Sequence, residues 1–143
     1  MDDTDRELLA QLESNARLPV ATLARRLGLA RSTVQARIER LEEKGIIAGY
    51  ALRLGDAARG DRIRATVLIS IEPRSTPAVL ARLKTLTQVE AAHTASGRWD
   101  MVLQLAAPST ASLDEVLDAI GEIDGVNSSE SLIHLSTRID RLG

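Results

Sequence analysis

The stretch "LARSTVQARIERLEEKG", residues 29–45, decides how the N-terminal third of the chain folds. Three of its apolar residues recur at intervals of four and three positions: Val34, Ile38 and Leu41. This spacing places them on one face of an α-helix, which we expect to run from about Arg31 to Lys44 because Gly45 follows as a stop. Such a face needs partner helices, and the preceding residues supply them.

Two further helices are predicted upstream of this stretch. The first begins near Asp2 or Asp3, either of which can cap it. The second runs from about residue 20 to residue 27, and Gly28 suits the tight corner that follows. A helix, a short turn containing glycine and a second helix form the helix-turn-helix unit, whose second helix enters the major groove of DNA. Residues 1–48 are therefore predicted to be a three-helix, helix-turn-helix DNA-binding domain.

Charge is distributed unevenly along the chain, although the net charge is only −2. Residues 17–41 hold six arginines and one acidic residue, whereas residues 72–143 hold six basic and ten acidic residues. This asymmetry suggests that the N-terminal part meets a polyanion. The chain has one Tyr, one Trp and no Phe, too few aromatic faces to stack the bases of RNA or single-stranded DNA. Duplex DNA is therefore the favoured partner.

The third helix turns a polar face outward when its apolar face is buried. The helical period places six residues there: Ser32, Thr33, Gln35, Ala36, Arg37 and Arg40. Arg and Gln side chains can make bidentate contacts with guanine and adenine, while Arg26 and Arg31 are expected to approach phosphates. On an isolated helix this face would be an ordinary solvated surface. The Gly28 turn and the excess of arginine favour contact with DNA.

Residues 49–61, "GYALRLGDAARGD", separate the two halves of the chain. They are predicted to begin as a short strand, in which Tyr50, Leu52 and Leu54 alternate, and to end as a linker. From there residues 62–143 change character and form a second domain.

The second domain is predicted to contain four strands and two helices. In chain order they are strand 62–72, helix 76–87, strands 89–97 and 100–108, helix 112–123 and strand 126–139. Ser112 followed by Glu115 fits a capping box at the start of the second helix. The β-α-β-β-α-β order is the ferredoxin-like pattern, so the predicted fold class of the chain is α+β. Helices on one face leave the other face of the sheet uncovered, and a symmetric dimer, sheet on sheet, would bury it.

The two halves in this order resemble the Lrp/AsnC family of transcription factors, the feast/famine regulators, over nearly the whole chain. The residues that carry the resemblance are "DDTDRELLAQL" (2–12), "NARLPVATLARRLGLARSTVQARIERLEEKGIIAGY" (15–50), "TASGRWDMVLQL" (94–105) and "IDGVNSSESLIHLST" (123–137). The resemblance implies a sequence-specific regulator that binds double-stranded DNA. It also implies a C-terminal domain that assembles homodimers into higher oligomers, often octamers, and binds a small effector, typically an amino acid.

The resemblance also implies where that effector binds. In the family a Gly-x-x-Asp loop between the second and third strands of the C-terminal domain lines the site, and here it runs from Gly97 through Trp99 to Asp100. Two hydroxyl residues of the last strand face the same ligand, and the matching positions are Ser129 and Ser131, two apart and hence on one face. Asp100 can accept hydrogen bonds from an α-ammonium group, and backbone N–H groups and hydroxyls can bind an α-carboxylate.

The sequence departs from the family pattern at two positions. Trp99 stands where the family usually has Tyr or Phe. Two roles stay open for it: a larger ring that narrows the pocket, or an interface or core residue. Ala30 stands where the family often has a Ser that caps the recognition helix, and Ser32 is the next residue able to cap it. Two other functions stay open: an architectural protein that wraps DNA without responding to an effector, and an enzyme or an amino-acid-sensing enzyme subunit.

Other functional classes have little support in the sequence. There is no cysteine, and His93 and His134 each lie on a predicted strand without a second His or Cys nearby, so no metal site and no cofactor are expected. No nucleophile with its base, P-loop or paired-carboxylate site is recognisable, so no catalytic residue is expected. The start of the chain is unlike a signal peptide and no apolar run is long enough to span a membrane, so a reducing cytoplasm is the expected location.

Overall fold

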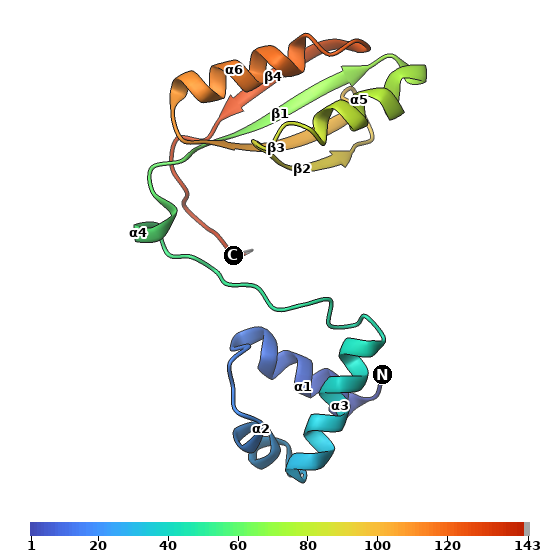
Figure 1. Cartoon of the computed structure of the whole chain (residues 1–143), viewed down its shortest axis with the longest axis vertical. Helices are drawn as coiled ribbons and strands as arrows, with labels where there is room; N and C mark the ends of the chain where they lie inside the picture. Colours follow the sequence, from blue (N-terminus) through green and yellow to red (C-terminus); the bar gives the residue numbers. More distant parts are fainter. Residues whose placement is uncertain (142–143) are drawn as a thin grey trace. The chain divides into compact units, whose positions relative to one another are not determined.

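The computed structural model describes residues 1–141, without the side chains of Asp56 and Arg59. The chain forms two compact units, Met1–Arg53 and Leu54–Gly143, and each is described here by itself. Figure 1 shows three helices in the first unit and a sheet with helices in the second. Within residues 1–141, no helix combines the length and the apolar character needed to cross a membrane.

The first unit is the predicted helix-turn-helix. Its helices are α1 (Asp3–Ser14), α2 (Val20–Leu27) and α3 (Arg31–Glu43) (Figure 1). They share one core whose buried members are Leu8, Leu23, Ala24, Val34, Ile38 and Leu41. The predicted inward face of α3 is therefore confirmed, and its opposite face is left to solvent.

The helix ends explain where these elements begin and stop. Asp2 caps α1 in a capping box: its side chain accepts a hydrogen bond from the backbone N–H of Asp5, whose side chain accepts one from the backbone N–H of Asp2. Gly28 ends α2 in the left-handed conformation, with φ of 67°. Helix α3 starts at Arg31 after Ala30 without a side-chain cap, so the suggested capping by Ser32 is wrong. Ser32 already lies in the first turn, where its own backbone is helical.

The strand predicted at the start of residues 49–61 is absent. Residues 49–55 have no regular secondary structure, and a four-residue helix, α4 (Asp56–Arg59), follows. A strand needs a neighbouring strand to pair with, and no described strand pairs with this segment. Tyr50, Leu52 and Leu54 consequently stay exposed, Leu52 to 84%.

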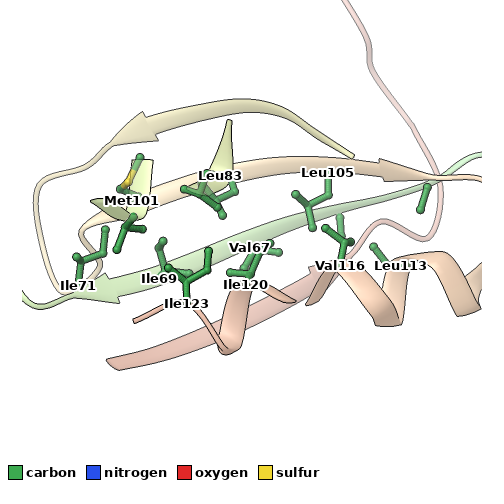
Figure 2. Packing of buried hydrophobic residues seen from close by; sticks show 14 residues of the cluster. Val67, Ile69, Ile71, Leu83, Met101, Leu105, Leu113, Val116, Ile120 and Ile123 are labelled. Atoms are coloured by element: carbon green, nitrogen blue, oxygen red, sulfur yellow. The ribbon is translucent and has the colours of Figure 1, made fainter. Parts of the chain in front are cut away.

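The second unit has the predicted ferredoxin-like order. It contains β1 (Ile63–Ile71), the short 3₁₀ helix η1 (Pro73–Ser75), α5 (Thr76–Leu83), β2 (Val89–Thr94), β3 (Met101–Ala107), α6 (Thr110–Gly121) and β4 (Val126–Ile133). The strands form one antiparallel sheet in the order β2-β3-β1-β4. Alternate residues of β1 and β3 are buried together with residues of α5 and α6, so both helices cover the same face (Figure 2).

The start of α6 differs from its prediction. Ser109, not Ser112, is the N-cap, and its side chain accepts a hydrogen bond from the backbone N–H of Ser112. The helix thus begins two residues earlier than the sequence pattern indicated, because the first suitable hydroxyl after β3 takes the capping position. A capping box formed by Ser112 and Glu115 is therefore wrong.

The other face of the sheet carries no helix and is chemically mixed. Its central strand offers four half-buried residues that alternate with the core: Arg64, Thr66, Leu68 and Ser70. Thr66 donates a hydrogen bond to Gln104 over 3.0 Å and is hydrogen-bonded to Nε2 of His134 over 2.8 Å. Leu68 lies between Val102 and Glu130 in the register of β3, β1 and β4. We refer to this surface as the open face.

Candidate functional site

The outward side of α3 presents most of the residues predicted to contact DNA. Ser32, Thr33, Gln35 and Arg40 are all exposed. Gln35 donates a hydrogen bond of 3.2 Å to Glu39 one turn later, an exposed contact that a base can replace. The Arg40 side chain makes no ion pair or hydrogen bond with any residue that the structure describes. Residues 32, 36 and 40 form one stripe opposite the core, so their side chains can reach a groove together.

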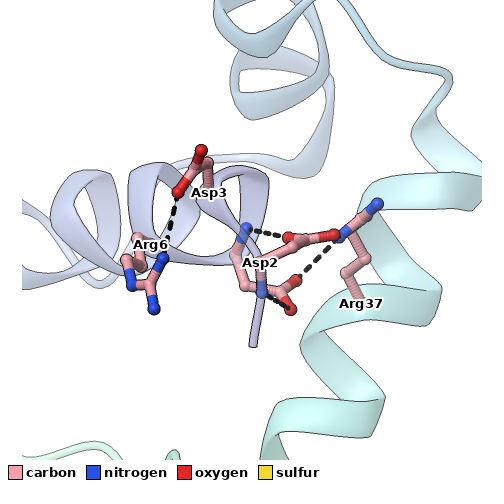
Figure 3. Close-up of polar contacts among 5 residues, drawn as sticks. Asp2, Asp3, Arg6 and Arg37 are labelled. Atoms are coloured by element: carbon pink, nitrogen blue, oxygen red, sulfur yellow. Dashed lines mark hydrogen bonds and ion pairs between the residues drawn. The ribbon is translucent and has the colours of Figure 1, made fainter.

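Arg37 behaves differently from its neighbours. Its Nη1 donates to both carboxylate oxygens of Asp2, at 2.9 and 2.8 Å, and to Oδ1 of Asp5 at 2.9 Å (Figure 3). Its side chain is 23% exposed, and that of Asp5 only 10%. The sequence pattern turned Arg37 outward, whereas the structure holds it between α3 and the start of α1.

These contacts shift the ionisation of the groups that make them. The Arg37 guanidinium, followed by the backbone N–H of Asp5, lowers the pKa of Asp2 from 3.8 to about 2. The carboxylates of Asp2 and then Asp5 raise the pKa of Arg37. Asp2 and Arg37 are therefore both ionised at neutral pH. The sequence indicated Asp2 or Asp3 as a cap of α1 and gave no sign that Asp2 and Asp5 contact Arg37.

The two arginines predicted to approach phosphates lie at the ends of helices. Arg26, in the last turn of α2, donates a hydrogen bond of 2.7 Å to Oε1 of Gln11 in α1. Arg31 is the first residue of α3 and is exposed. A positive side chain at an uncapped helix start, where backbone N–H groups are free, is suited to an anionic ligand.

The predicted effector loop joins β2 to β3. Gly97 lies in the bend of this loop, and the guanidinium carbon of Arg98 sits 5.4 Å from the centroid of the half-buried Trp99 ring. Asp100 ends the loop, and its Oδ2 accepts a hydrogen bond of 2.7 Å from the backbone N–H of Ile71. Its Oδ1 makes no hydrogen bond with a described residue, which leaves one oxygen for a ligand.

The two predicted hydroxyls of β4 are exposed but lie apart from Asp100. Ser129 pairs with Ile69, and Ser131 pairs with Val67. Strand β1 therefore stands between them and the Asp100 loop, a separation of two strand spacings or roughly 10 Å. A pair that the sequence did not indicate lies nearer, since the hydroxyls of Ser70 and Ser128 are 2.6 Å apart on the open face.

Among the described residues, the remaining ionisable side chains form no recognisable reaction centre. His134 is hydrogen-bonded to Thr66, as described above, and His93 is exposed on β2. Across residues 1–141, no group of three or more His, Cys, Asp or Glu side chains is arranged to hold a metal ion.

Comparison with protein families matches both units of the chain. Residues 1–48 match the model of a winged helix-turn-helix DNA-binding domain, and residues 64–142 match that of the Lrp/AsnC ligand binding domain. The HTH-type transcriptional regulator LrpA of Mycobacterium tuberculosis is 32% identical over 134 residues, which cover 93% of this chain and 89% of that protein. Such relatives are regulators of transcription rather than enzymes.

Solved structures agree with this match along nearly the whole chain. E. coli AsnC superposes with a TM-score of 0.90 at 30% identity, covering 99% of this chain and 96% of AsnC. A feast or famine regulatory protein of M. tuberculosis in complex with L-methionine gives a TM-score of 0.87 at 32% identity, covering 99% and 97%. The chain thus belongs to the Lrp/AsnC family of DNA-binding transcriptional regulators and carries that family's ligand-binding domain.

Proposed function

We propose that this regulator recognises specific sites in duplex DNA through α3 and that an amino acid bound to its C-terminal unit changes this binding. The observation that carries the DNA part is the exposed side of α3, where Arg40 has no partner among the described residues. Thr33, Gln35 and Arg40 supply the donors and acceptors that read base edges, and Ser32 lies on the same side. Arg26 and Arg31 approach phosphates and set the register.

The ligand-binding unit is proposed to take an α-amino acid. A related regulator has been solved with L-methionine, and the free Oδ1 of Asp100 suits an α-ammonium group. Gly97 and Trp99 belong to the same loop as Asp100. Because β1 separates Ser129 and Ser131 from that loop, we place their hydroxyls on the same ligand from a neighbouring copy of the chain. The site is then complete only in an oligomer, so binding and assembly are linked.

The open face is proposed to pack on that of a second copy, giving a symmetric dimer that assembles further. Leu68, Val102 and Leu132 supply its apolar part, and Leu132 is 49% exposed in the single chain. A dimer presents two copies of α3, which matches two half-sites separated by whole turns of DNA. A regulator of this kind acts in the cytoplasm, where its DNA is.

Selection of duplexes from a random pool by the full chain tests the DNA part. We expect enrichment of a two-fold symmetric sequence that binds at least about a thousand-fold more tightly than random duplex. Replacing Arg40 by Ala is expected to weaken this binding and to relax the preference for one base pair of the site. Replacing Arg31 by Ala is expected to weaken binding and to lower the slope of log affinity against log salt by about 0.9 per lost phosphate contact. Arg82→Ala, the same change on the exposed side of α5, is the matched control. A specificity ratio near one would indicate an architectural protein instead.

A thermal-shift screen of the twenty amino acids tests the ligand part. A ligand at 100 times its dissociation constant stabilises the folded state by about 2.7 kcal/mol, which is readily detected. We expect at least one amino acid to raise the melting temperature and expect Asp100→Ala to abolish that rise. A response that survives this substitution would place the ligand elsewhere.

A further inference from the structure

Arg37 is the one cation of α3 whose side chain is engaged by two carboxylates among the described residues. It stands next to Ile38 and one turn before Leu41, at the edge of the buried face rather than on the outermost stripe. The three oxygens that it contacts belong to Asp2 and Asp5, all within 2.9 Å. We call this cluster of three residues the clasp.

The clasp joins two places that are more than 30 residues apart in the sequence. Asp2 and Asp5 are the two members of the capping box that starts α1, and Arg37 lies at the middle of α3 (Figure 3). The carboxylates therefore serve two purposes, since they cap the start of α1 and also bind Arg37 of the recognition helix. Because their orientation is fixed by the capping hydrogen bonds of 2.8 and 3.3 Å, they present a preorganised site to Arg37.

Release of Arg37 to DNA would be unfavourable. A phosphate offers one negative charge, whereas the clasp offers two, and one of its carboxylates is largely removed from solvent. Moving Arg37 away would also leave the like charges of Asp2 and Asp5 without a counterion. These two carboxylates would then face the negative charge of the DNA unneutralised. Arg40, one turn later, has no such contacts and can turn to DNA at no similar cost.

We infer that Arg37 is a positioning residue: it fixes the orientation of α3 against the start of α1, and the DNA contacts are made by Arg40 and its exposed neighbours. This inference rests on the proposed DNA binding. It assigns Asp2 and Asp5 a part in DNA affinity, although both carry the charge that DNA repels.

The first test compares salt dependence in the full chain, with the duplex selected by the unsubstituted protein. We expect Arg37→Gln to lower the affinity at least about five-fold and to leave the slope of log affinity against log salt unchanged. Arg31→Ala, at a proposed phosphate contact, is expected to lower both. A slope that falls by about 0.9 in Arg37→Gln would overturn the positioning role and make Arg37 a phosphate contact, with the proposed DNA binding intact.

The second test asks whether affinity rises or falls when an acidic residue of the clasp is neutralised. Removal of a negative charge near DNA ordinarily raises affinity, yet we expect Asp5→Asn to lower it by a factor similar to that of Arg37→Gln. The double variant should bind no worse than Arg37→Gln alone, because that substitution already removes the contacts to both Asp2 and Asp5. Asp3→Asn is the matched control. Among the described residues Asp3 pairs with the exposed Arg6 alone, so loss of its charge should leave affinity unchanged or higher.

The outcomes separate the two proposals. If Asp5→Asn raises affinity as Asp3→Asn does, the clasp has no part in recognition and the inference is overturned. If the unsubstituted protein binds no duplex even in dilute salt, the proposed function is wrong, and the inference that rests on it is wrong as well. Circular dichroism of each variant serves as the control for whether the helices of the first unit remain folded.

Discussion

Oδ2 of Asp100 accepts a hydrogen bond of 2.7 Å from the backbone N–H of Ile71, the last residue of β1. The backbone of Asp100 adds two more bonds, because its N–H donates to the carbonyl of Ile69 over 2.9 Å and its carbonyl accepts from Ala95 over 3.0 Å. The residue that the family resemblance assigns to the effector is thus also the residue that ties the β2–β3 loop to the sheet. Oδ2 makes the side-chain bond to the sheet, and Oδ1 is the oxygen proposed to bind the effector.

This division predicts different behaviour for two substitutions of Asp100. Asn retains an oxygen that can accept from Ile71, whereas Ala leaves that N–H without its acceptor, at a cost of about 1 kcal/mol. For a chain of this size that corresponds to a melting temperature lower by roughly 2–4 °C in Asp100→Ala only. Both variants lack the full negative charge, so both should lose the amino-acid response in the thermal-shift screen. Equal melting temperatures for Asn and Ala would contradict the structural role.

The low pKa of Asp2 makes the first unit sensitive to acid. Because the folded-state pKa lies near 2 and the ordinary value is 3.8, ionised Asp2 stabilises the fold above about pH 4. That contribution declines as the pH falls from about 4 through 2, where the carboxylate becomes protonated in the folded state as well. We expect the side-chain carboxyl of Asp2, followed by NMR, to titrate with a midpoint near 2.

Substitution of Arg37 provides the control for this titration. Arg37 is the largest cause of the lowered pKa, so in Arg37→Gln the midpoint should move back toward 3.8. The capping bond from the backbone N–H of Asp5 remains and should keep it slightly below that value. An unsubstituted protein that already titrates near 3.8 would show that the clasp does not form in solution.

Much of the fold is predictable because local patterns and tertiary structure agree. The apolar spacing of α3 is set by burial against α1 and α2, and Gly28 adopts the left-handed conformation that its place in the sequence indicated. The prediction errors occur where another residue nearby could take the same role, or where a predicted strand had no neighbouring strand. Ser109 precedes Ser112 and takes the cap of α6. The alternation of Tyr50, Leu52 and Leu54 resembles a strand, but a strand also needs a neighbour to pair with.

The candidate sites are predictable only in part, for a related reason. Helical periodicity determines that Arg37 leaves the apolar core, but it does not show that Asp2 and Asp5 lie within reach, since this depends on how α1 packs on α3. Strand alternation likewise places Ser129 and Ser131 on one face without giving the strand order. The observed order puts β1 between them and Asp100, which no pattern of spacing in the sequence contains.

Gly125 is expected to tolerate no side chain. It has φ of 100°, and a Cβ added there would lie 2.3 Å from Cβ of Ser75 and 3.3 Å from Val79. Positive φ costs a non-glycine residue roughly 1–2 kcal/mol and overpacking adds about 1–3 kcal/mol. Gly125→Ala should therefore lower the free energy of unfolding of the second unit by at least about 2 kcal/mol. Urea denaturation followed by fluorescence measures this, because Trp99 is the only tryptophan and belongs to that unit.

Gly121 provides a matched comparison for the same substitution. It is the last residue of α6, its Cβ would meet no atom within 4 Å, and its φ is not positive. Gly121→Ala should leave stability unchanged or raise it by up to about 1 kcal/mol. Similar losses for both variants would show that the effect at Gly125 comes from general sensitivity to alanine rather than from its contact with Ser75.

Leu68 tests the proposed packing of one open face on another. It is half-buried in the single chain at the centre of that face, between Val102 and Glu130. In a sheet-on-sheet dimer Leu68→Glu would place a charge in the interface beside Glu130. The dissociation constant of the dimer should therefore rise at least about ten-fold. Sedimentation equilibrium measures this constant. Thr87→Glu, at an exposed turn after α5, introduces the same charge away from the open face and should leave the dimer intact. If Leu68→Glu and Thr87→Glu associate equally well, the dimer uses another surface and the open face needs a different partner.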